Sequence, residues 1–145
     1  MYMGNTIFII TVLKGAAMAY IIGCLMAGLS FSLNRLLLKY IGLKIVISYS
    51  PIIEELTKTI CSYYLEADIL ATHITFGILE AAYDWYQNNN VPRGKKAAFL
   101  SITGHTLFGV LTITFLNLSG SIFIGIFTAI CAHLIWNITL IRLAD

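Results

Sequence analysis

Ionisable residues recur inside stretches of this chain that are otherwise apolar. Seven of them stand out, namely Glu54, Glu55, Lys58, Glu80, Asp84, His105 and His133. Placing one ionisable group within lipid costs about 2.5 to 3.5 kcal/mol on insertion scales, so such residues mark functional sites by default. A carboxylate near histidines and shielded from bulk water can take a proton from water and return it to a leaving amine. The pattern therefore predicts acid–base chemistry of a hydrolytic kind.

The types and spacing of four residues suggest which part of a hydrolytic reaction each could perform. We expect Glu54 to activate water and His105 to polarise a carbonyl group. His133 and Asn137 are four residues apart on one helical face, which offers an imidazole and an amide to an oxyanion. By the same spacing, Glu54 and Lys58 share a face and could form an ion pair.

Some of the polar residues are expected to have structural or boundary positions. Adjacent Glu54 and Glu55 point about 100° apart on a helix, so one of them is expected to hold structure. Asp84, near a helix end, is expected to be solvated or to snorkel to the membrane interface. His73 lies toward the outer end of its apolar stretch and is expected to be a boundary group.

A metal site is the alternative chemistry. The chain has no HExxH motif, yet His105, His133 and Glu80 could supply three zinc ligands. We favour a site without a cofactor and keep zinc as the alternative.

Composition predicts a membrane protein. Of the 145 residues, 59% are hydrophobic and 11% are charged, whereas soluble domains carry about 25% charged residues. The lipid bilayer is therefore an expected partner, and the net charge of +2 does not indicate nucleic acid. Five apolar stretches are long enough to span a bilayer and should be helical: about 15–33 (extended back to about 6 if tilted), 45–64, 69–86, 97–117 and 121–141. Pro51 is expected to kink or interrupt the second.

The loops between these stretches alternate in charge. Basic residues follow the first, third and fifth stretches, whereas the other loops are acidic or uncharged. The positive-inside rule then places the N-terminus outside and the C-terminus in the cytoplasm, with five spans in the cell membrane. The expected organisation is one all-α transmembrane domain over 1–145. Its motif-bearing core is about 45–141, and an accessory first helix covers about 6–34.

Depth predicts that the polar groups meet. Glu54, Glu80, His105 and His133 each lie eight to ten residues from a loop expected on the cytoplasmic side. At 1.5 Å per residue this is about 12 to 15 Å below that boundary. Four helices would thus deliver polar side chains to one layer of the bundle.

Four short motifs also resemble those of a known family. In chain order they are Pro51–Lys58 with an EExxK pattern, Phe76–Glu80 with FxxxE, Gly104–Gly109 around a single histidine, and His133–Asn137 with HxxxN. The ordered set resembles the PrsW-type membrane proteases. These belong to the CPBP superfamily, together with CAAX prenyl endopeptidases and bacteriocin-processing proteins. Lys58 stands where CAAX-type members have an arginine one residue further on, which favours the PrsW branch.

The resemblance implies glutamate-dependent, metal-independent cleavage of a membrane-anchored protein or peptide. The expected catalytic set is Glu54, Glu55, Glu80, His105, His133 and Asn137, supported by Lys58 and Phe76. In this scheme Glu54 activates water, and His133 and Asn137 hold the oxyanion. The alternatives are a non-catalytic membrane scaffold of the same fold, a zinc-dependent intramembrane protease, and a small proton- or ion-coupled carrier.

Overall fold

The computed structural model describes residues 2–87 and 92–144, in which all regular secondary structure is helical. The five helices of these residues are α1 (Tyr2–Tyr40), α2 (Leu43–Tyr64), α3 (Ile69–Gln87), α4 (Pro92–Ser119) and α5 (Ile122–Ala144). The all-α prediction is confirmed. Four of the helices contain a predicted stretch, and α5 covers the fifth stretch except for Ser121.

Local sequence explains where several helices end. Gly42 between α1 and α2 and Gly120 between α4 and α5 have φ angles of 99° and 70°. Glycine adopts such angles without steric cost, so both reversals occur where the chain is free to turn. Pro51 does not interrupt α2, which is one helix from Leu43 to Tyr64. Proline removes a single N–H donor, and the flanking turns retain theirs.

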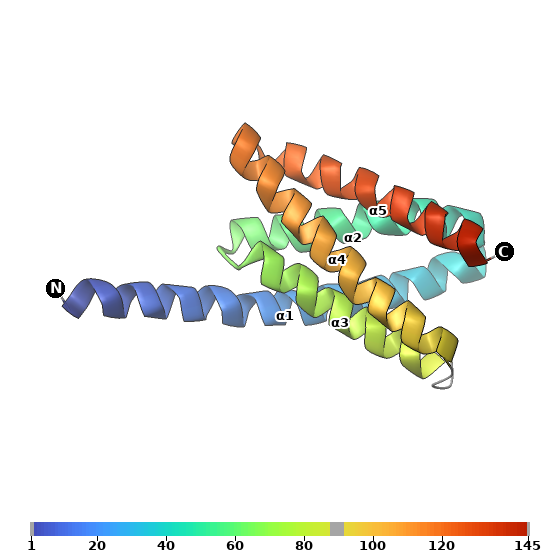
Figure 1. Cartoon of the computed structure of the whole chain (residues 1–145), viewed down its shortest axis with the longest axis horizontal. Helices are drawn as coiled ribbons and strands as arrows, with labels where there is room; N and C mark the ends of the chain where they lie inside the picture. The colour runs from blue at the N-terminus through green and yellow to red at the C-terminus, as the bar shows by residue number, and fades with distance from the viewer. Residues whose placement is uncertain (1, 88–91, 145) are drawn as a thin grey trace.

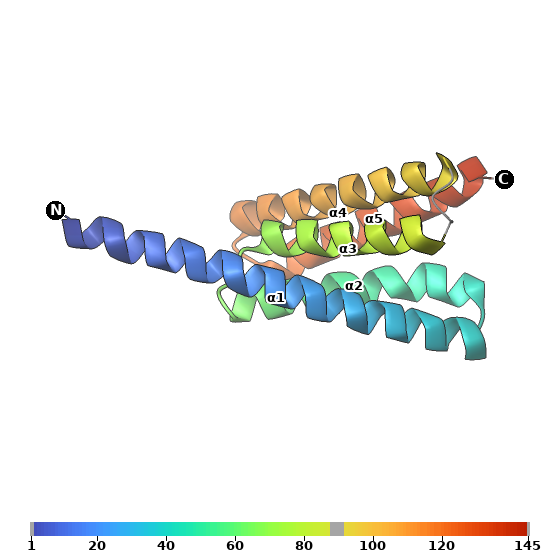
Figure 2. The same cartoon turned by 90° about the horizontal axis from the view of Figure 1, so that it is seen from below.

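The helices form a bundle in which α3 is central. It packs against α4, α1 and α2, while α5 packs against α4 and α2. Figure 2 shows α1 and α2 on one side of the molecule and α3, α4 and α5 on the other. The N-terminal part of α1 projects beyond the other helices in both views (Figures 1 and 2).

Three helical segments are long and apolar enough to cross a membrane. They are Ile9–Tyr40, Gly94–Ser119 and Ile122–Leu143. Large apolar side chains such as Leu25, Phe99 and Phe127 cover the exterior. These features are those of a membrane protein.

The interior, by contrast, is rich in polar groups. Lys58 is the largest of the fully buried side chains. Other buried polar side chains include Glu54, Glu55, Thr59, Ser62, Thr72, His73, His105, Thr112 and His133. A soluble protein has the opposite distribution, with lysine and glutamate almost always at its surface. Buried polar groups must find partners inside the bundle, and these partners define the site.

Candidate active site

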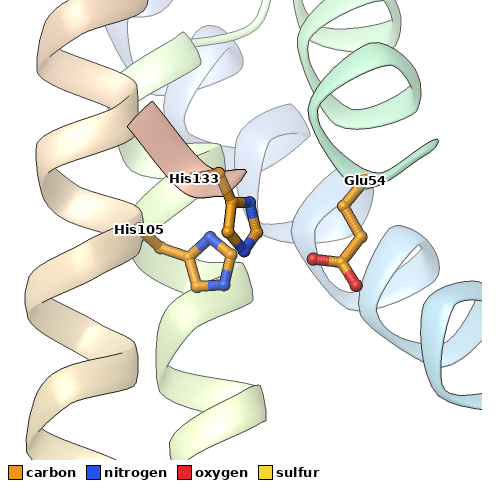
Figure 3. Close-up of side chains that lie close together, drawn as sticks. All are labelled: Glu54, His105 and His133. Carbon is orange, nitrogen blue, oxygen red and sulfur yellow. The ribbon is translucent and has the colours of Figure 1, made fainter. Parts of the chain in front are cut away.

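Three buried side chains from three helices face one another. Glu54 on α2, His105 on α4 and His133 on α5 each offer one ligating atom, and these atoms lie within 4.8 Å of one another. The side chains are almost completely buried, with 4%, 2% and 4% of their residues' surface exposed. In Figure 3 the Glu54 carboxylate points toward the two imidazole rings. The predicted convergence of these residues is confirmed.

Glu54 is held by hydrogen bonds to one of its oxygens. Ser30 and Ser50 both donate to Oε1 at 2.6 Å, and the Asn34 amide lies 3.4 Å from the same atom. Because these donors all approach Oε1, the other oxygen, Oε2, is left for the space in front of the histidines.

The sequence analysis missed the two contributors from α1. Ser30 and Asn34 lie one turn apart and continue the small-residue face formed by Ala19, Gly23 and Ala27. Such faces pack closely against other helices. Polar residues that extend one of these faces are a signal that could have placed Ser30 and Asn34 at the site.

Glu55 has different partners from its neighbour. Lys58 donates to Glu55 Oε1 at 2.6 Å, and His133 Nδ1 lies 2.9 Å from the same oxygen. The predicted ion pair between Glu54 and Lys58 is therefore wrong. Ser30 on α1 and Ser50 on α2 donate hydrogen bonds to Glu54. Lys58 instead pairs with Glu55, three residues before it. The adjacent glutamates therefore have separate sets of partners, Ser30 and Ser50 for Glu54, and Lys58 and His133 for Glu55.

The contact with Glu55 determines which nitrogen of His133 is available. Paired with the Lys58 ammonium, Glu55 is a carboxylate and only accepts hydrogen bonds. His133 must then donate its Nδ1 proton, which leaves Nε2 free to face Glu54. Nε2 accepts a proton when the ring is neutral and donates once it has taken one.

The partners of His105 also determine which of its ring nitrogens carries the proton. The Lys58 ammonium lies 2.9 Å from His105 Nδ1 and has only donors, so Nδ1 accepts. The ring proton is therefore on Nε2, which donates to Glu80 Oε2 at 2.7 Å. Ser101 donates to the same Glu80 oxygen at 2.6 Å. Glu80 therefore contacts the other polar groups of the predicted layer through its hydrogen bond with His105.

These bonds bear on the zinc alternative. Both ring nitrogens of His105 are engaged, so only Glu54 and His133 have lone pairs that face the centre. A catalytic zinc site usually has three protein ligands. The expected set of His105, His133 and Glu80 fits poorly, because Glu80 uses the very nitrogen of His105 that a metal would need.

Aromatic rings fix the orientation of the histidines. Phe76 is fully buried, with Lys58 Nζ 4.6 Å and the His105 ring 4.7 Å from its centroid. Phe108 stacks on His133 with centroids 4.4 Å apart and planes 21° from parallel. Opposite His105, a Cβ atom added at Gly77 would lie 2.9 Å from the His105 Cβ. Glycine at this position therefore allows α3 and α4 to approach closely.

His73 lies where it was not expected. His73 is fully buried, with Nε2 3.2 Å from Thr59 Oγ1 and Nδ1 3.7 Å from Glu55 Oε2. Its assignment as a boundary group was wrong, since neighbouring helices cover the first turns of α3. Asp84 is half-buried rather than fully solvated, and lines two cavities.

A cavity of about 520 Å³ opens between α3, α4 and α5. Its polar lining includes His105, His133 and Asn137, which is consistent with the predicted face of His133 and Asn137. Its apolar walls are formed by Ala97, Leu100, Phe108, Trp136, Leu140 and Leu143. Glu54 lies behind the histidines and is not part of the lining.

Comparison with protein-family models, with curated proteins and with solved structures gave no significant match. The function must therefore be argued from the geometry of the site and from the motifs that it contains.

Proposed function

We propose that this chain is an intramembrane endopeptidase that uses Glu54 to activate water and cleaves a membrane-anchored protein or peptide. The observation that carries the proposal is the meeting of Glu54, His105 and His133, buried on three helices beside a cavity. A carboxylate and an imidazole at such separation can share a water molecule, which is the requirement for general-base hydrolysis. The ordered motifs that resemble PrsW-type proteases support the same activity.

The proposal includes five membrane spans, with the N-terminus outside and the C-terminus in the cytoplasm. At 1.5 Å per residue, the 22 residues of α2 and the 19 of α3 are about 33 and 28 Å long. Both lengths match a hydrocarbon core of about 30 Å. α2 and α3 contribute Glu54, Glu55, Lys58 and Glu80, which lowers their mean hydropathy, and the surrounding helices provide those groups with partners.

The proposed reaction has two steps. Glu54 takes a proton from water as the water oxygen attacks the peptide carbonyl carbon, and the carbonyl oxygen becomes an oxyanion. The Asn137 amide and the Nε2 of protonated His133 donate to that oxygen. Glu54 then returns the proton to the amine nitrogen as the C–N bond breaks. The products are a carboxylic acid and an amine, so one water is consumed for each bond.

The surroundings of the reacting groups fit a peptide substrate. A volume of about 520 Å³ lies in the usual range of about 300 to 1,000 Å³ for ligand pockets. The apolar walls of this cavity can hold the side chains of a membrane-embedded peptide segment. We therefore call it the substrate cavity. Glu55 supports the reaction by orienting His133, and Lys58 by fixing both Glu55 and His105.

The decisive experiment is reconstitution of the protein in liposomes with a single-span substrate protein. We expect cleavage by the wild type and at least a 100-fold loss in Glu54→Gln, the range expected for removal of a general base. Glu66→Gln is the matched control, since Glu66 is exposed in the loop between α2 and α3. Unchanged cleavage by Glu54→Gln would remove the proposal.

One observation favours a non-catalytic scaffold as the second candidate. Lys58 links Glu55 and His105, His105 links to Glu80 by internal bonds, and Glu54 does not line the cavity. A scaffold would capture a membrane-anchored partner without cleaving it. Cross-linking of an intact partner by wild type and Glu54→Gln alike, with no product from either, would support this candidate over the protease.

A further inference from the structure

A second cavity lies on the opposite side of α3 from the first. It occupies about 640 Å³ between α1 and α3. Its lining is Phe31, Asn34, Arg35, Leu38, Glu80, Tyr83, Asp84 and Gln87. We call it the polar cavity, because five of these side chains carry a charge or an amide. Glu80 and Asp84 line both cavities, so they form the wall between them.

The polar cavity reaches the reacting carboxylate through one residue. Asn34 lines the cavity, and its side chain lies 3.4 Å from Glu54 Oε1 and 2.7 Å from Ser50 Oγ. The lining also includes Arg35, the residue after Asn34, and Gln87 at the end of α3, both of them exposed. Polar side chains therefore line the space between exposed residues and Asn34, which contacts Glu54.

The two cavities differ in what they can hold. The substrate cavity has apolar side chains from α4 and α5, and its polar lining includes His133 and Asn137. An apolar peptide segment that fills it would expel water from it. Hydrolysis nevertheless needs one water for every bond.

We propose that the polar cavity is the route by which water and protons reach Glu54 and Glu80, separate from the cavity that the substrate fills. The part of this inference that concerns hydrolysis rests on the proposed protease function. The route itself is a property of the fold and is open to test in a protein without any activity. Asn34 is the residue through which the route meets the site.

Accessibility of single cysteines tests the route directly. Cys24, Cys61 and Cys131 are first replaced by alanine, and the protein is placed in lipid nanodiscs, which leave both faces open. A charged, membrane-impermeant methanethiosulfonate then probes Asn34→Cys in the polar cavity and Leu140→Cys in the substrate cavity. The control is Leu29→Cys, because Leu29 is 49% exposed on the outside of α1 and would face lipid.

We expect Asn34→Cys to react at least about tenfold faster than Leu29→Cys, because the reagent attacks the thiolate that forms in water. Filling the substrate cavity with Ala97→Trp should slow the reaction of Leu140→Cys and leave that of Asn34→Cys unchanged. Leu100→Trp is the second filling variant. Equal slowing of both cysteines would reveal one continuous chamber and overturn the proposal, as would an Asn34→Cys that reacts no faster than the lipid-facing control.

Activity provides the second readout. Asn34→Leu should lower kcat by about tenfold and leave KM within about twofold, since the substrate is still bound but water delivery is impaired. The matched control is Asn117→Leu. Asn117 is exposed near the C-terminal end of α4 and lines neither cavity. A wild-type kcat in Asn34→Leu would contradict the inference. If no cleavage occurs in any variant, the protease proposal fails, and the labelling experiment still decides the route.

Discussion

Lys58 donates to Glu55 at 2.6 Å across one turn of α2, and neither side chain has any exposed surface. The same ammonium lies 2.9 Å from His105 Nδ1. One buried cation thus connects α2 to α4, and through Glu55 also to His133 on α5. Its position explains how three helices hold a common geometry although their interior is polar.

Removing this cation should be more harmful than any surface substitution. Lys58→Met would leave Glu55 as a buried, uncompensated carboxylate, which we expect to cost about 3 to 5 kcal/mol of stability. The measurement is thermal unfolding of the detergent-solubilised protein. Lys96→Met, at an exposed position on the rim of the substrate cavity, is the control and should be close to wild type. A similar melting temperature for the two variants would show that Lys58 is not essential to the network.

Ser30 should act through Glu54 and not through the fold. Ser30→Ala removes one of the hydrogen bonds to Glu54 Oε1, and bonds to charged groups are worth about 1.5 to 3 kcal/mol. If this energy positions the reacting carboxylate, kcat should fall at least about tenfold, while the melting temperature stays close to that of the wild type.

Ser32→Ala is the matched control for that substitution. Ser32 is exposed and donates to the Gly28 carbonyl of its own helix, so cleavage should be unchanged. A loss in Ser30→Ala that is equalled by Ser32→Ala would assign the effect to α1 itself rather than to Glu54.

Gly77 should be intolerant of a methyl group. The Cβ of Gly77→Ala would approach the His105 Cβ to 2.9 Å and the Ile102 Cα to 3.3 Å, so α3 and α4 must separate. Overpacking of this kind costs about 1 to 3 kcal/mol, and displacement of His105 should reduce cleavage as well.

Gly28→Ala is the comparison for the effect of alanine in a helix. An added Cβ at Gly28 meets nothing within 4 Å, and alanine is favoured over glycine in helices by about 1 kcal/mol. That variant should therefore be at least as stable as wild type. Equal stability of the two alanine variants would refute close packing at Gly77.

Metal removal should leave activity intact. Both nitrogens of His105 already have partners, so Glu54 and His133 alone would have to retain a zinc ion. We expect cleavage to persist after dialysis against a chelator, and elemental analysis of the purified protein to find far less than one zinc per chain. A stoichiometric metal that restores lost activity would instead support the zinc-dependent alternative.

Much of the fold could be predicted because the signals are periodic and long. Each helix coincides with an apolar stretch, and residue counts from the loops placed Glu54, His105 and His133 at one depth. Depth counting is reliable because the rise per residue of a helix is constant.

The pairing within the site could not be predicted in this way. The spacing of four residues allowed an ion pair between Lys58 and Glu54. In the structure Ser30 on α1 donates to Glu54, and Lys58 pairs with Glu55. Which of two adjacent glutamates faces a neighbour depends on the rotation of α2 against α1 and α5, and the sequence of one helix does not contain that rotation. His73 was misplaced for a related reason, because its distance from a helix end said nothing about the helices that cover it.

The polar character of α2 and α3 also constrains how the protein is made. The segments Ile9–Tyr40, Gly94–Ser119 and Ile122–Leu143 are long and apolar enough to cross a membrane. α2 and α3 carry Glu54, Glu55, Glu80 and Lys58, whose charges make insertion into lipid more costly. In the five-span arrangement they must be retained beside the insertion machinery until a neighbouring helix offers them partners. Assembly of the site would then be part of membrane integration itself, and a variant with a broken network would be recovered in lower yield than the wild type.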